Sequence, residues 1–332
     1  MNLKSTESAL IVMSKSPRIA ITLPPSKGVG TGNLRTAQRW LGIFIELGYD
    51  ARILGPEEAL DCEVLVALNA VKSIDAITRF HHQQPRGQLV VAVTGTDMNR
   101  QESDAWQNSM AWADRLVVLQ ARAKDSLAAE LQSKAHLIHQ GVRLPANLAS
   151  TGAGEGFQVC VVGHLRKEKD PLLTAMAARV LEDDSRIQIV QAGAILEEEF
   201  THAVVREREM NPRYQWMGEL SKMEALKLIA QSDLMVLSST SEGGAGVIGE
   251  AVTTGTPILA SRIDGVLGLL GEDYPGYFEA GSVLALAELL KRAEKDSGFY
   301  QSLKEAGAQK KLLFTPEQER ENWERLLGLS LS

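Results

Sequence analysis

Two carboxylates flank a run of small residues in the second half of the chain. The segment SEGGAGVIGEAVTTGTP (241–257) places Glu242 and Glu250 around the small residues Gly243, Gly244, Ala245, Gly246 and Val247. If a helix begins near Gly246, the amides before it lie at a helix N-terminus, where peptide dipoles favour an anion. Carboxylates cannot hold a phosphate, but they accept hydrogen bonds from hydroxyl groups. The segment therefore predicts a ligand in which a phosphate lies between two hydroxyl-bearing parts, in the order sugar, phosphate, ribose.

The same segment also allows a structural interpretation. Glu242 would then cap the helix, and Glu250 would be a solvated helical glutamate, which is common for this residue type. The glycine run together with the spacing of the two glutamates favours the binding interpretation.

A second glycine-rich segment lies near the start of the chain. KGVGTGNLRTAQRW follows the apolar run RIAITL, so Gly28, Gly30 and Gly32 can form a close turn before a helix. The turn would deliver Asn33 and the next amides to an anion. A dinucleotide-binding fingerprint is disfavoured, because the third glycine is misplaced and no acidic residue clearly ends the second strand about 20 residues on.

Two more loops would open at the same edge of the predicted sheet. ALNAVKS presents Lys72, and VTGTDM presents Thr94, Thr96 and Asp97. Lys72 and Thr96 could bind phosphate oxygens, whereas Asp97 could orient a water molecule or an acceptor group. The alternative is that Thr96 and Asp97 form a turn and helix cap beside Gly95, with Lys72 simply exposed.

The elements that must position these residues are short apolar runs alternating with amphipathic segments. Such runs are typical of buried parallel strands. They are RIAITL (18–23), DARIL (50–54), EVLVAL (63–68), QLVVAV (88–93), RLVVL (115–119) and AHLIH (135–139), then FQVCVVG (157–163), RIQIVQAG (186–193), YQWMG (214–218), DLMVLSS (233–239) and PILAS (257–261). We expect an α/β protein with two doubly wound, Rossmann-like domains whose strand ends face one cleft.

The polar segment PANLASTGAGEG (145–156) interrupts this pattern as a linker would. We expect a loose extension over residues 1–14, an acceptor-binding domain over 15–148 and a donor-binding domain over 149–315. A helix within 316–332 could pack back on the first domain.

Composition limits the classes of function. The chain has 332 residues, 44% of them hydrophobic, and a net charge of -7, which disfavours nucleic acid and acidic membranes as partners. Cys62 and Cys160 lie in apolar runs and are expected to be buried thiols in a reducing cytoplasm. No apolar stretch approaches the roughly 20 residues needed to cross a bilayer, and residues 1–14 lack a signal-peptide core. Histidine and cysteine spacing predicts no metal site.

The strand ending in serines and the motif SEGGAGVIGEAVTTGTPILAS resemble the donor site of glycosyltransferase family 4, which has the GT-B fold. LIHQGV (137–142) is similar to the segment that ends the first domain in that family. VVGHLRKEKDP (161–171) is similar to its basic loop, which holds the donor diphosphate. The chain departs from the family at His164, where an arginine is usual; Lys169 matches the second cation, and Arg166 would supply the missing charge.

A closer resemblance spans nearly the whole chain. TGNLRTAQRW, VAVTGTD, ADRLVVLQ, VVGHLRKEKDP, NPRYQWMGEL, SSTSEGGAGVIGEA and GLLGEDYPGYF together resemble the selenosugar synthases of selenoneine biosynthesis. The resemblance implies transfer of a hexosyl unit from UDP-N-acetylglucosamine or UDP-glucose to selenophosphate. A carbon–selenium bond would form, and UDP and phosphate would be released.

The resemblance also implies roles for individual residues. Glu242 would contact the sugar, residues 243–247 the diphosphate and Glu250 the ribose, and His164, Gly218 and Leu220 would complete the donor site. On the acceptor side, the loops that leave the first predicted sheet contribute the residues expected to bind the acceptor: Gly30, Gly32, Asn33, Lys72, Thr94 and Thr96. Glu242, Lys169, Arg166 and Asp97 are the candidate catalytic residues.

The expected chemistry needs little general-base assistance. Selenophosphate already carries an anionic, nucleophilic selenium, so the enzyme would mainly position two anions and stabilise charge on departing UDP. No metal or other cofactor is expected. Two alternatives remain open: a conventional glycosyltransferase with a hydroxyl acceptor, for which Asp97 is the candidate base, and a non-catalytic sugar-nucleotide sensor.

Overall fold

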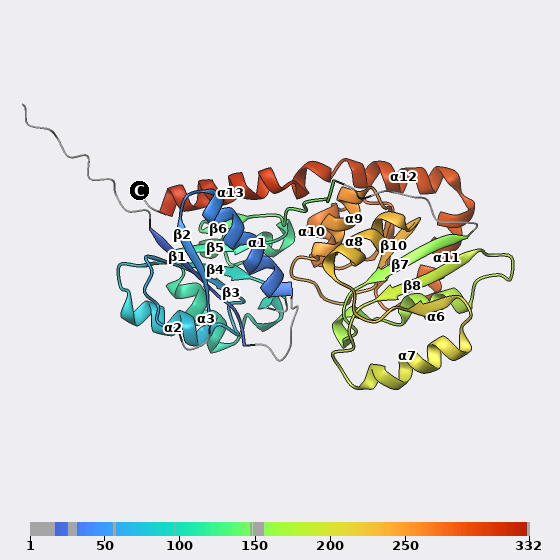
Figure 1. Cartoon of the computed structure of the whole chain (residues 1–332), viewed down its shortest axis with the longest axis horizontal. Helices are drawn as coiled ribbons and strands as arrows, with labels where there is room; N and C mark the ends of the chain where they lie inside the picture. The colour runs from blue at the N-terminus through green and yellow to red at the C-terminus, as the bar shows by residue number, and fades with distance from the viewer. Residues whose placement is uncertain are drawn as a thin grey trace, which may run out of the picture.

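The chain folds into two α/β domains, each built on a parallel six-stranded sheet (Figure 1). The computed structural model describes residues 17–25, 32–55, 58–95, 97–146, 148 and 156–330. We call the part up to residue 148 the first domain and the part over 156–314 the second domain.

The first domain holds a sheet with the strand order β2-β1-β3-β4-β5-β6. Its elements are β1 (Arg18–Thr22), α1 (Gly32–Glu46), β2 (Asp50–Leu54), β3 (Val64–Leu68), α2 (Ile74–Gln83), β4 (Gln88–Val93), η1 (Asp97–Arg100), α3 (Asp104–Trp112), β5 (Arg115–Val118), α4 (Ala121–Asp125), α5 (Ala129–Gln132) and β6 (Ala135–Leu137). The strand order reverses at β1, so the loops after β1 and β3 open side by side at one edge of the sheet.

The second domain repeats this plan with the strand order β12-β11-β10-β7-β8-β9. Its elements are β7 (Phe157–Val162), η2 (Lys167–Lys169), α6 (Leu173–Arg179), β8 (Ile187–Ala192), α7 (Glu199–Met210), β9 (Tyr214–Trp216), α8 (Lys222–Gln231), β10 (Leu234–Leu237), α9 (Gly246–Thr254), β11 (Ile258–Ser261), α10 (Asp264–Leu270), β12 (Tyr277–Phe278), α11 (Val283–Lys295), α12 (Ser297–Ala308) and η3 (Lys311–Phe314). The loop after β7 and the loop after β10 meet at its reversal point.

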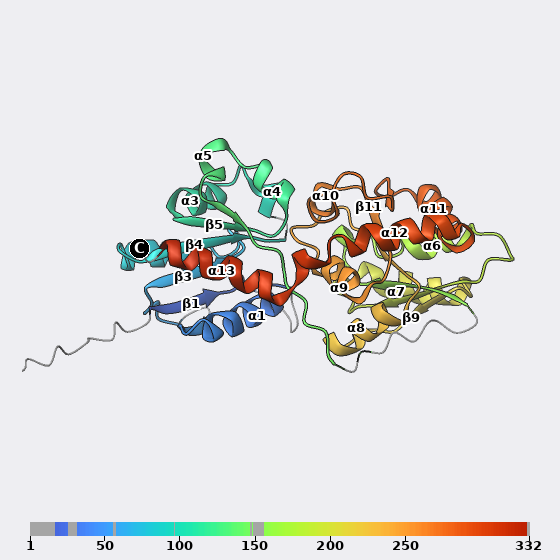
Figure 2. The ribbon, with the colours of Figure 1, turned by 90° about the horizontal axis from the view of Figure 1, so that it is seen from above.

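Every apolar run predicted as a strand is a strand, and all neighbouring strands pair in parallel. The runs are apolar throughout because both faces of each sheet are covered by helices. In the first sheet Ile19 and Ile21 pack with Trp40 of α1, whereas Leu65 packs with Trp106 of α3 on the opposite face. Figure 2 shows these two helical layers edge on. Among the strands of the described residues, the short strand β12 was the one not predicted, because two residues make no recognisable run.

The last helix, α13 (Pro316–Ser330), returns to the first domain and lies along it (Figures 1 and 2). The Trp323 ring packs edge-on against Trp40 and Phe44 of α1, with centroids 4.7 and 4.8 Å apart. Trp323 is fully buried in the same core as the first sheet. The end of the described chain therefore contributes to the first hydrophobic core.

Glu319 fixes α13 in this position. It is 1% exposed and accepts hydrogen bonds from Arg39 Nε at 2.8 Å, from Trp40 Nε1 at 2.8 Å and from Gly141 N at 2.9 Å. A buried carboxylate is stable only when paired and hydrogen-bonded, and these donors satisfy that need. Glu319 thus joins α1, α13 and the segment that leaves the first domain.

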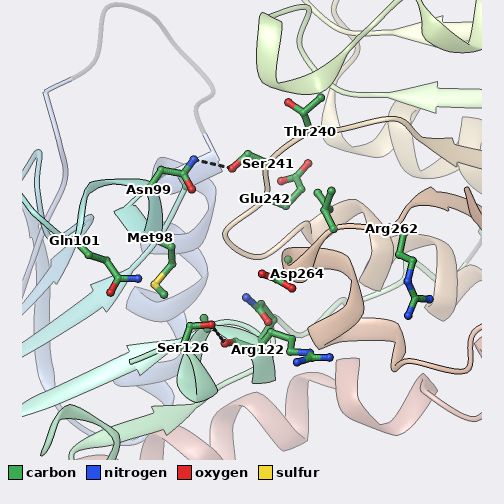
Figure 3. Close-up of a pocket in the computed structure, with 15 residues that line it drawn as sticks. Met98, Asn99, Gln101, Arg122, Ser126, Thr240, Ser241, Glu242, Arg262 and Asp264 are labelled. Atoms are coloured by element: carbon green, nitrogen blue, oxygen red, sulfur yellow. Dashed lines mark hydrogen bonds between the residues drawn. The ribbon is translucent and has the colours of Figure 1, made fainter. Parts of the chain in front are cut away.

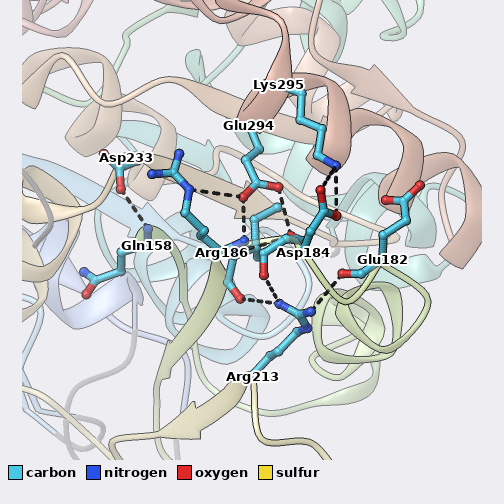
Figure 4. Close-up of polar contacts among 10 residues, drawn as sticks. Gln158, Glu182, Asp184, Arg186, Arg213, Asp233, Glu294 and Lys295 are labelled. Atoms are coloured by element: carbon cyan, nitrogen blue, oxygen red, sulfur yellow. Dashed lines mark hydrogen bonds and ion pairs between the residues drawn. The ribbon is translucent and has the colours of Figure 1, made fainter. Parts of the chain in front are cut away.

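A network of charged residues joins the segment before β8 to the end of α11 in the second domain (Figure 4). Glu294 accepts hydrogen bonds from Ser185 Oγ at 2.9 Å and Arg186 N at 2.6 Å, and Lys295 pairs with Asp184 at 3.1 Å. This network lies at the amino ends of the strands, away from the loops that could bind a ligand. Within the described ranges, no helix is long and apolar enough to cross a membrane.

Candidate active site

A cleft of about 510 Å³ lies between the two domains, at the carboxyl ends of both sheets. This is the place where ligands of doubly wound folds bind. Most of the predicted site residues line it: His164, Arg166, Lys169, Leu220, Glu242, Gly243, Gly244, Ala245, Gly246, Val247 and Glu250 from the second domain, and Gly32, Asn33, Lys72 and Thr94 from the first. The fold therefore brings together segments that are far apart in sequence.

The loop after β10 carries Glu242 into the cleft. The Glu242 carboxylate pairs with Lys169 Nζ, and Ser239 Oγ donates to its Oε1 at 2.6 Å. The Glu242 side chain is 7% exposed and that of Lys169 20% exposed. Lys169 is held at the end of η2, where Ser238 Oγ donates to the Lys169 carbonyl at 2.9 Å. One cation and one carboxylate therefore meet at a mostly buried position on the cleft wall.

Helix α9 begins at Gly246, as predicted. No side chain caps it, so Glu242 does not have the helix-capping role that was its structural alternative. The first amides of an α-helix have no carbonyl partner within the helix, and those of Gly246 and Val247 lie at the cleft. This helix start can accept an anion beside Lys169.

Glu250 lies one to two turns into α9 and also lines the cleft, where it is partly buried. Burial raises the pKa of its carboxyl, and the positive charges of Lys222, Arg35 and Arg39 partly oppose this effect. Glu250 is therefore not the fully solvated helical glutamate of the structural alternative, because it is partly buried on the cleft wall near these cations.

The first domain contributes a positively charged wall. Arg35, Arg39, Lys72 and Arg100 line the cleft, and no aspartate or glutamate of the described part of this domain does so. Thr94 is 3% exposed, and its Oγ1 has no hydrogen-bond partner among the described residues. This wall is suited to an anionic ligand.

Asp97 and Gly218 do not line the cleft, contrary to expectation. The Asp97 carboxylate is 1% exposed and accepts hydrogen bonds from three backbone amides, so it does not face an acceptor. The Gly218 carbonyl accepts from Gly193 N at 2.7 Å and shapes the turn beside β9. Gly30 and Thr96 lie outside the described residues.

The basic loop after β7 is arranged by contacts within the second domain. His164 Nδ1 accepts a hydrogen bond from Ala194 N at 3.2 Å, which orients the ring at the cleft wall. The Arg166 guanidinium lies 3.9 Å from the Glu168 carboxylate, a loose pair at a partly exposed position. Arg166 and Lys169 therefore form the cationic side of the donor loop.

Several cleft residues were not predicted from the sequence: Arg35, Arg39, Arg100, Gln140, Glu219 and Lys222. Arg35 and Arg39 are four residues apart on α1, so they lie on the same face of that helix. This spacing after a glycine-rich turn was a signal that could have identified them. Arg100 and Gln140 follow no such pattern.

The two domains touch through glycine-rich backbone. A Cβ added to Gly243 would lie 2.4 Å from Gly95 N and 2.6 Å from Gly95 O, and one added to Gly244 would lie 2.4 Å from Leu119 Cβ. These positions tolerate no side chain without movement of a neighbouring backbone or core residue. The donor loop thus rests directly on the first domain.

A second polar chamber of about 550 Å³ lies beyond this contact (Figure 3). Glu242 and Gly95 line both spaces. Asn99 Nδ2 donates to Ser241 Oγ across the domain boundary at 3.1 Å, and Arg122 pairs with Glu272 of the second domain. These contacts hold the domains together on the side of α4 and α10.

The family model for glycosyl transferases group 1 matches residues 148–310. The second half of the chain is therefore similar to this family. A comparison with curated protein sequences finds no match.

Solved structures of similar fold span nearly the whole chain. A sucrose-phosphate synthase from Thermosynechococcus elongatus has a TM-score of 0.76 at 15% identity, with 95% of this chain and 99% of that chain covered. HepE of Anabaena, solved with UDP and glucose, has a TM-score of 0.72 at 13% identity, with 94% and 99% covered. A glycosyltransferase from Rickettsia africae has a TM-score of 0.68 at 13% identity, with 94% and 98% covered. At these identities the likeness concerns the fold alone, and it confirms the predicted GT-B arrangement of two domains.

Proposed function

We propose that this chain, whose residues 148–310 match the group 1 glycosyl transferases, transfers a hexosyl unit from a UDP-sugar to selenophosphate. UDP-N-acetylglucosamine and UDP-glucose are the candidate donors. The charge of the cleft wall is the observation that supports an anionic acceptor. The described part of the first domain lines the wall with Arg35, Lys72 and Arg100, together with Arg39, which is paired with Glu319, and with no carboxylate of its own.

The donor half is supported by the arrangement around α9. The amides of Gly246 and Val247 and the Lys169 ammonium would hold the diphosphate, while Glu242 and Glu250 would accept hydrogen bonds from sugar and ribose hydroxyls. HepE of Anabaena, which shares the fold, is described in complex with UDP-glucose. Arg166 and His164 would complete the diphosphate side.

The acceptor half is supported by Arg35, Lys72, Arg100 and the unpartnered Thr94 hydroxyl. Asn33 follows the first residue of α1 and lines the same wall. A doubly charged acceptor would be attracted by this field, and a hydroxyl acceptor would gain little from it.

The chemistry would begin with attack of the selenium of selenophosphate on the anomeric carbon. A carbon–selenium bond forms as the bond from that carbon to the UDP oxygen breaks, and UDP leaves with the bonding electron pair. A water molecule must then cleave the phosphorus–selenium bond to release phosphate. Lys169 and the α9 amides would stabilise charge on departing UDP, the usual role of preorganised donors.

The burial of the candidate base Asp97 favours this acceptor over a hydroxyl. A hydroxyl acceptor must lose a proton, and the predicted base Asp97 is buried with its oxygens bonded to amides. An anionic selenium needs no deprotonation.

Mass spectrometry of reaction mixtures tests the proposal. Purified protein would be incubated with each UDP-sugar and with selenophosphate, inorganic phosphate or a sugar alcohol. We expect UDP release and a hexosyl-selenium product with selenophosphate only. Lys169→Met should abolish product, whereas Lys291→Met, in a surface pair with Glu182, should retain activity.

Product with the sugar alcohol and none with selenophosphate would establish the conventional glycosyltransferase instead. UDP-sugar binding without UDP release under any condition would establish a sensor. Either result would overturn the proposal.

A further inference from the structure

A buried carboxylate joins two first-domain loops beside the cleft. Asp97 Oδ2 accepts hydrogen bonds from Ala70 N at 2.8 Å and from Thr94 N at 2.9 Å, and its Oδ1 accepts from Val71 N at 3.3 Å. Ala70 and Val71 belong to the loop after β3, whereas Thr94 belongs to the loop after β4. One side chain therefore holds the backbones of both loops.

Asn69 ties the same loops together from the other side. Its Nδ2 donates to Thr94 O at 3.0 Å, and its Oδ1 accepts from Lys72 N at 2.8 Å. Asn69 has a φ of 71°, in the left-handed region that asparagine tolerates better than most residues. We call residues 69–73, 94, 95 and 97, with these side-chain bonds, the loop junction.

The loop junction presents groups to both halves of the cleft. Lys72 and Thr94 line the acceptor wall, and the Thr94 hydroxyl is buried with no partner among the described residues. Gly95, between them and Asp97, is the residue on which Gly243 of the donor loop rests. A shift of the junction would therefore move the acceptor groups and the contact with the donor loop together.

We propose that Asp97 is a positioning residue. Through the loop junction it holds Lys72 and Thr94 in the orientation that binds the acceptor, and it fixes the position of Gly95, which Gly243 contacts. This rests on the proposed function for the identity of the acceptor. The role differs from that of a general base, because Asp97 does not touch the cleft and its oxygens already accept three amide hydrogen bonds.

Asp97→Asn is the test, because the side chain keeps its size but offers one acceptor oxygen in place of two. With that oxygen bonded to Ala70 and Thr94, the new amide group must face the Val71 N–H, donor against donor. Asp114→Asn is the matched control. Asp114 accepts a hydrogen bond from Leu89 N at 2.8 Å, at the opposite edge of the same sheet.

Kinetics with selenophosphate varied at saturating UDP-sugar should show a KM about tenfold higher for Asp97→Asn, with kcat changed less than threefold. The Kd for UDP, from calorimetry, should stay within twofold of wild type. Asp114→Asn should match wild type in all three quantities. If Asp97→Asn fails to fold, Asn69→Gly is the second variant. It removes the two side-chain hydrogen bonds of Asn69, and glycine tolerates the left-handed φ. The same increase in KM is expected.

An unchanged acceptor KM in a folded Asp97→Asn protein would overturn the proposal. A collapse of kcat at unchanged KM would also overturn it, because that result identifies a proton-transfer group.

If the wild-type protein does not use selenophosphate, the proposed function fails. The positioning role of Asp97 is then tested by other measurements. Hydrogen exchange at the amides of Ala70, Val71 and Thr94, and affinity for inorganic phosphate as a probe, would then be compared between Asp97→Asn and Asp114→Asn. Faster exchange and weaker phosphate binding in Asp97→Asn alone would support the positioning role, and equal values would refute it.

Discussion

Replacing Gly243 by alanine should separate donor binding from turnover. The added Cβ would lie 2.4 Å from Gly95 N and 2.6 Å from Gly95 O, both in the first domain. Heavy atoms in non-bonded contact prefer a separation of about 3.5 Å, so one backbone must move by about 1 Å. Since the obstacle is backbone on both sides, no side-chain rotation relieves it.

The expected loss follows from the size of this displacement. A misplacement of about 1 Å between reacting groups can reduce a rate about 100-fold, which corresponds to about 3 kcal/mol in the barrier. Most of the donor-binding groups, including Glu250 and Lys169, belong to the second domain and would move as a unit. We therefore expect kcat/KM to fall about 100-fold while the Kd for UDP changes less than threefold.

The assay is UDP release under steady-state conditions, together with calorimetric titration of UDP. Gly307→Ala is the matched control, because a Cβ at this position of α12 has nothing within 4 Å. Wild-type turnover by Gly243→Ala would refute the reasoning, since it would show that the contact with Gly95 is not needed in the reacting state. A large loss of UDP affinity would place the effect in the donor loop itself.

Three further predictions concern carboxylates that are buried or partly buried. Glu250→Ala should weaken UDP binding about 10- to 100-fold by calorimetry with little change in kcat, because a ribose contact is made equally before and during reaction; an unchanged Kd would contradict the ribose role. Glu319→Ala should lower the free energy of unfolding by about 3–5 kcal/mol in urea titrations, because it leaves Arg39 partly buried and unpaired; a loss below about 1 kcal/mol would show that the site relaxes. Asp97 gives a pH dependence: burial raises its pKa from 3.8 to about 6, against three amides and the charge of Lys72. Its contribution to the free energy of unfolding is therefore full below pH 3.8 and is lost as the pH rises through 6. In urea titrations, the stability of Asp97→Asn relative to wild type should therefore rise by about 3 kcal/mol between pH 4 and pH 7. A difference in stability that does not change with pH would exclude this titration.

The sequence predicted the strands well because each is a continuous apolar run that both helical layers cover. DARIL and QLVVAV were placed with the bounds that β2 and β4 have. The start of α9 at Gly246 was also predicted, since the residues before it are small and the helix follows a strand end. These features depend on local pattern and on the fixed geometry of a parallel sheet.

The partners of individual polar residues could not be predicted in this way. Asp97 looked available for chemistry because it follows a strand at the expected edge of the sheet. Its actual partners, the amides of Ala70 and Val71, lie more than 20 positions earlier in the chain. The partners of Glu319 are still more distant, with Trp40 separated from it by 279 positions. Only the packed fold determines such pairs.

The chain passes between the domains twice, and the two passages lie side by side. Val142 N donates to Phe314 O at 2.8 Å, and Gly141 packs directly against the backbone of Pro316. Two adjacent chain segments joined by a backbone hydrogen bond resist twisting and sideways sliding more than a single segment does. They would act as a hinge, with rotation about one axis as the easiest relative motion of the two domains. Opening of the cleft would then follow one path, and each closure would return Gly243 to the same place on Gly95.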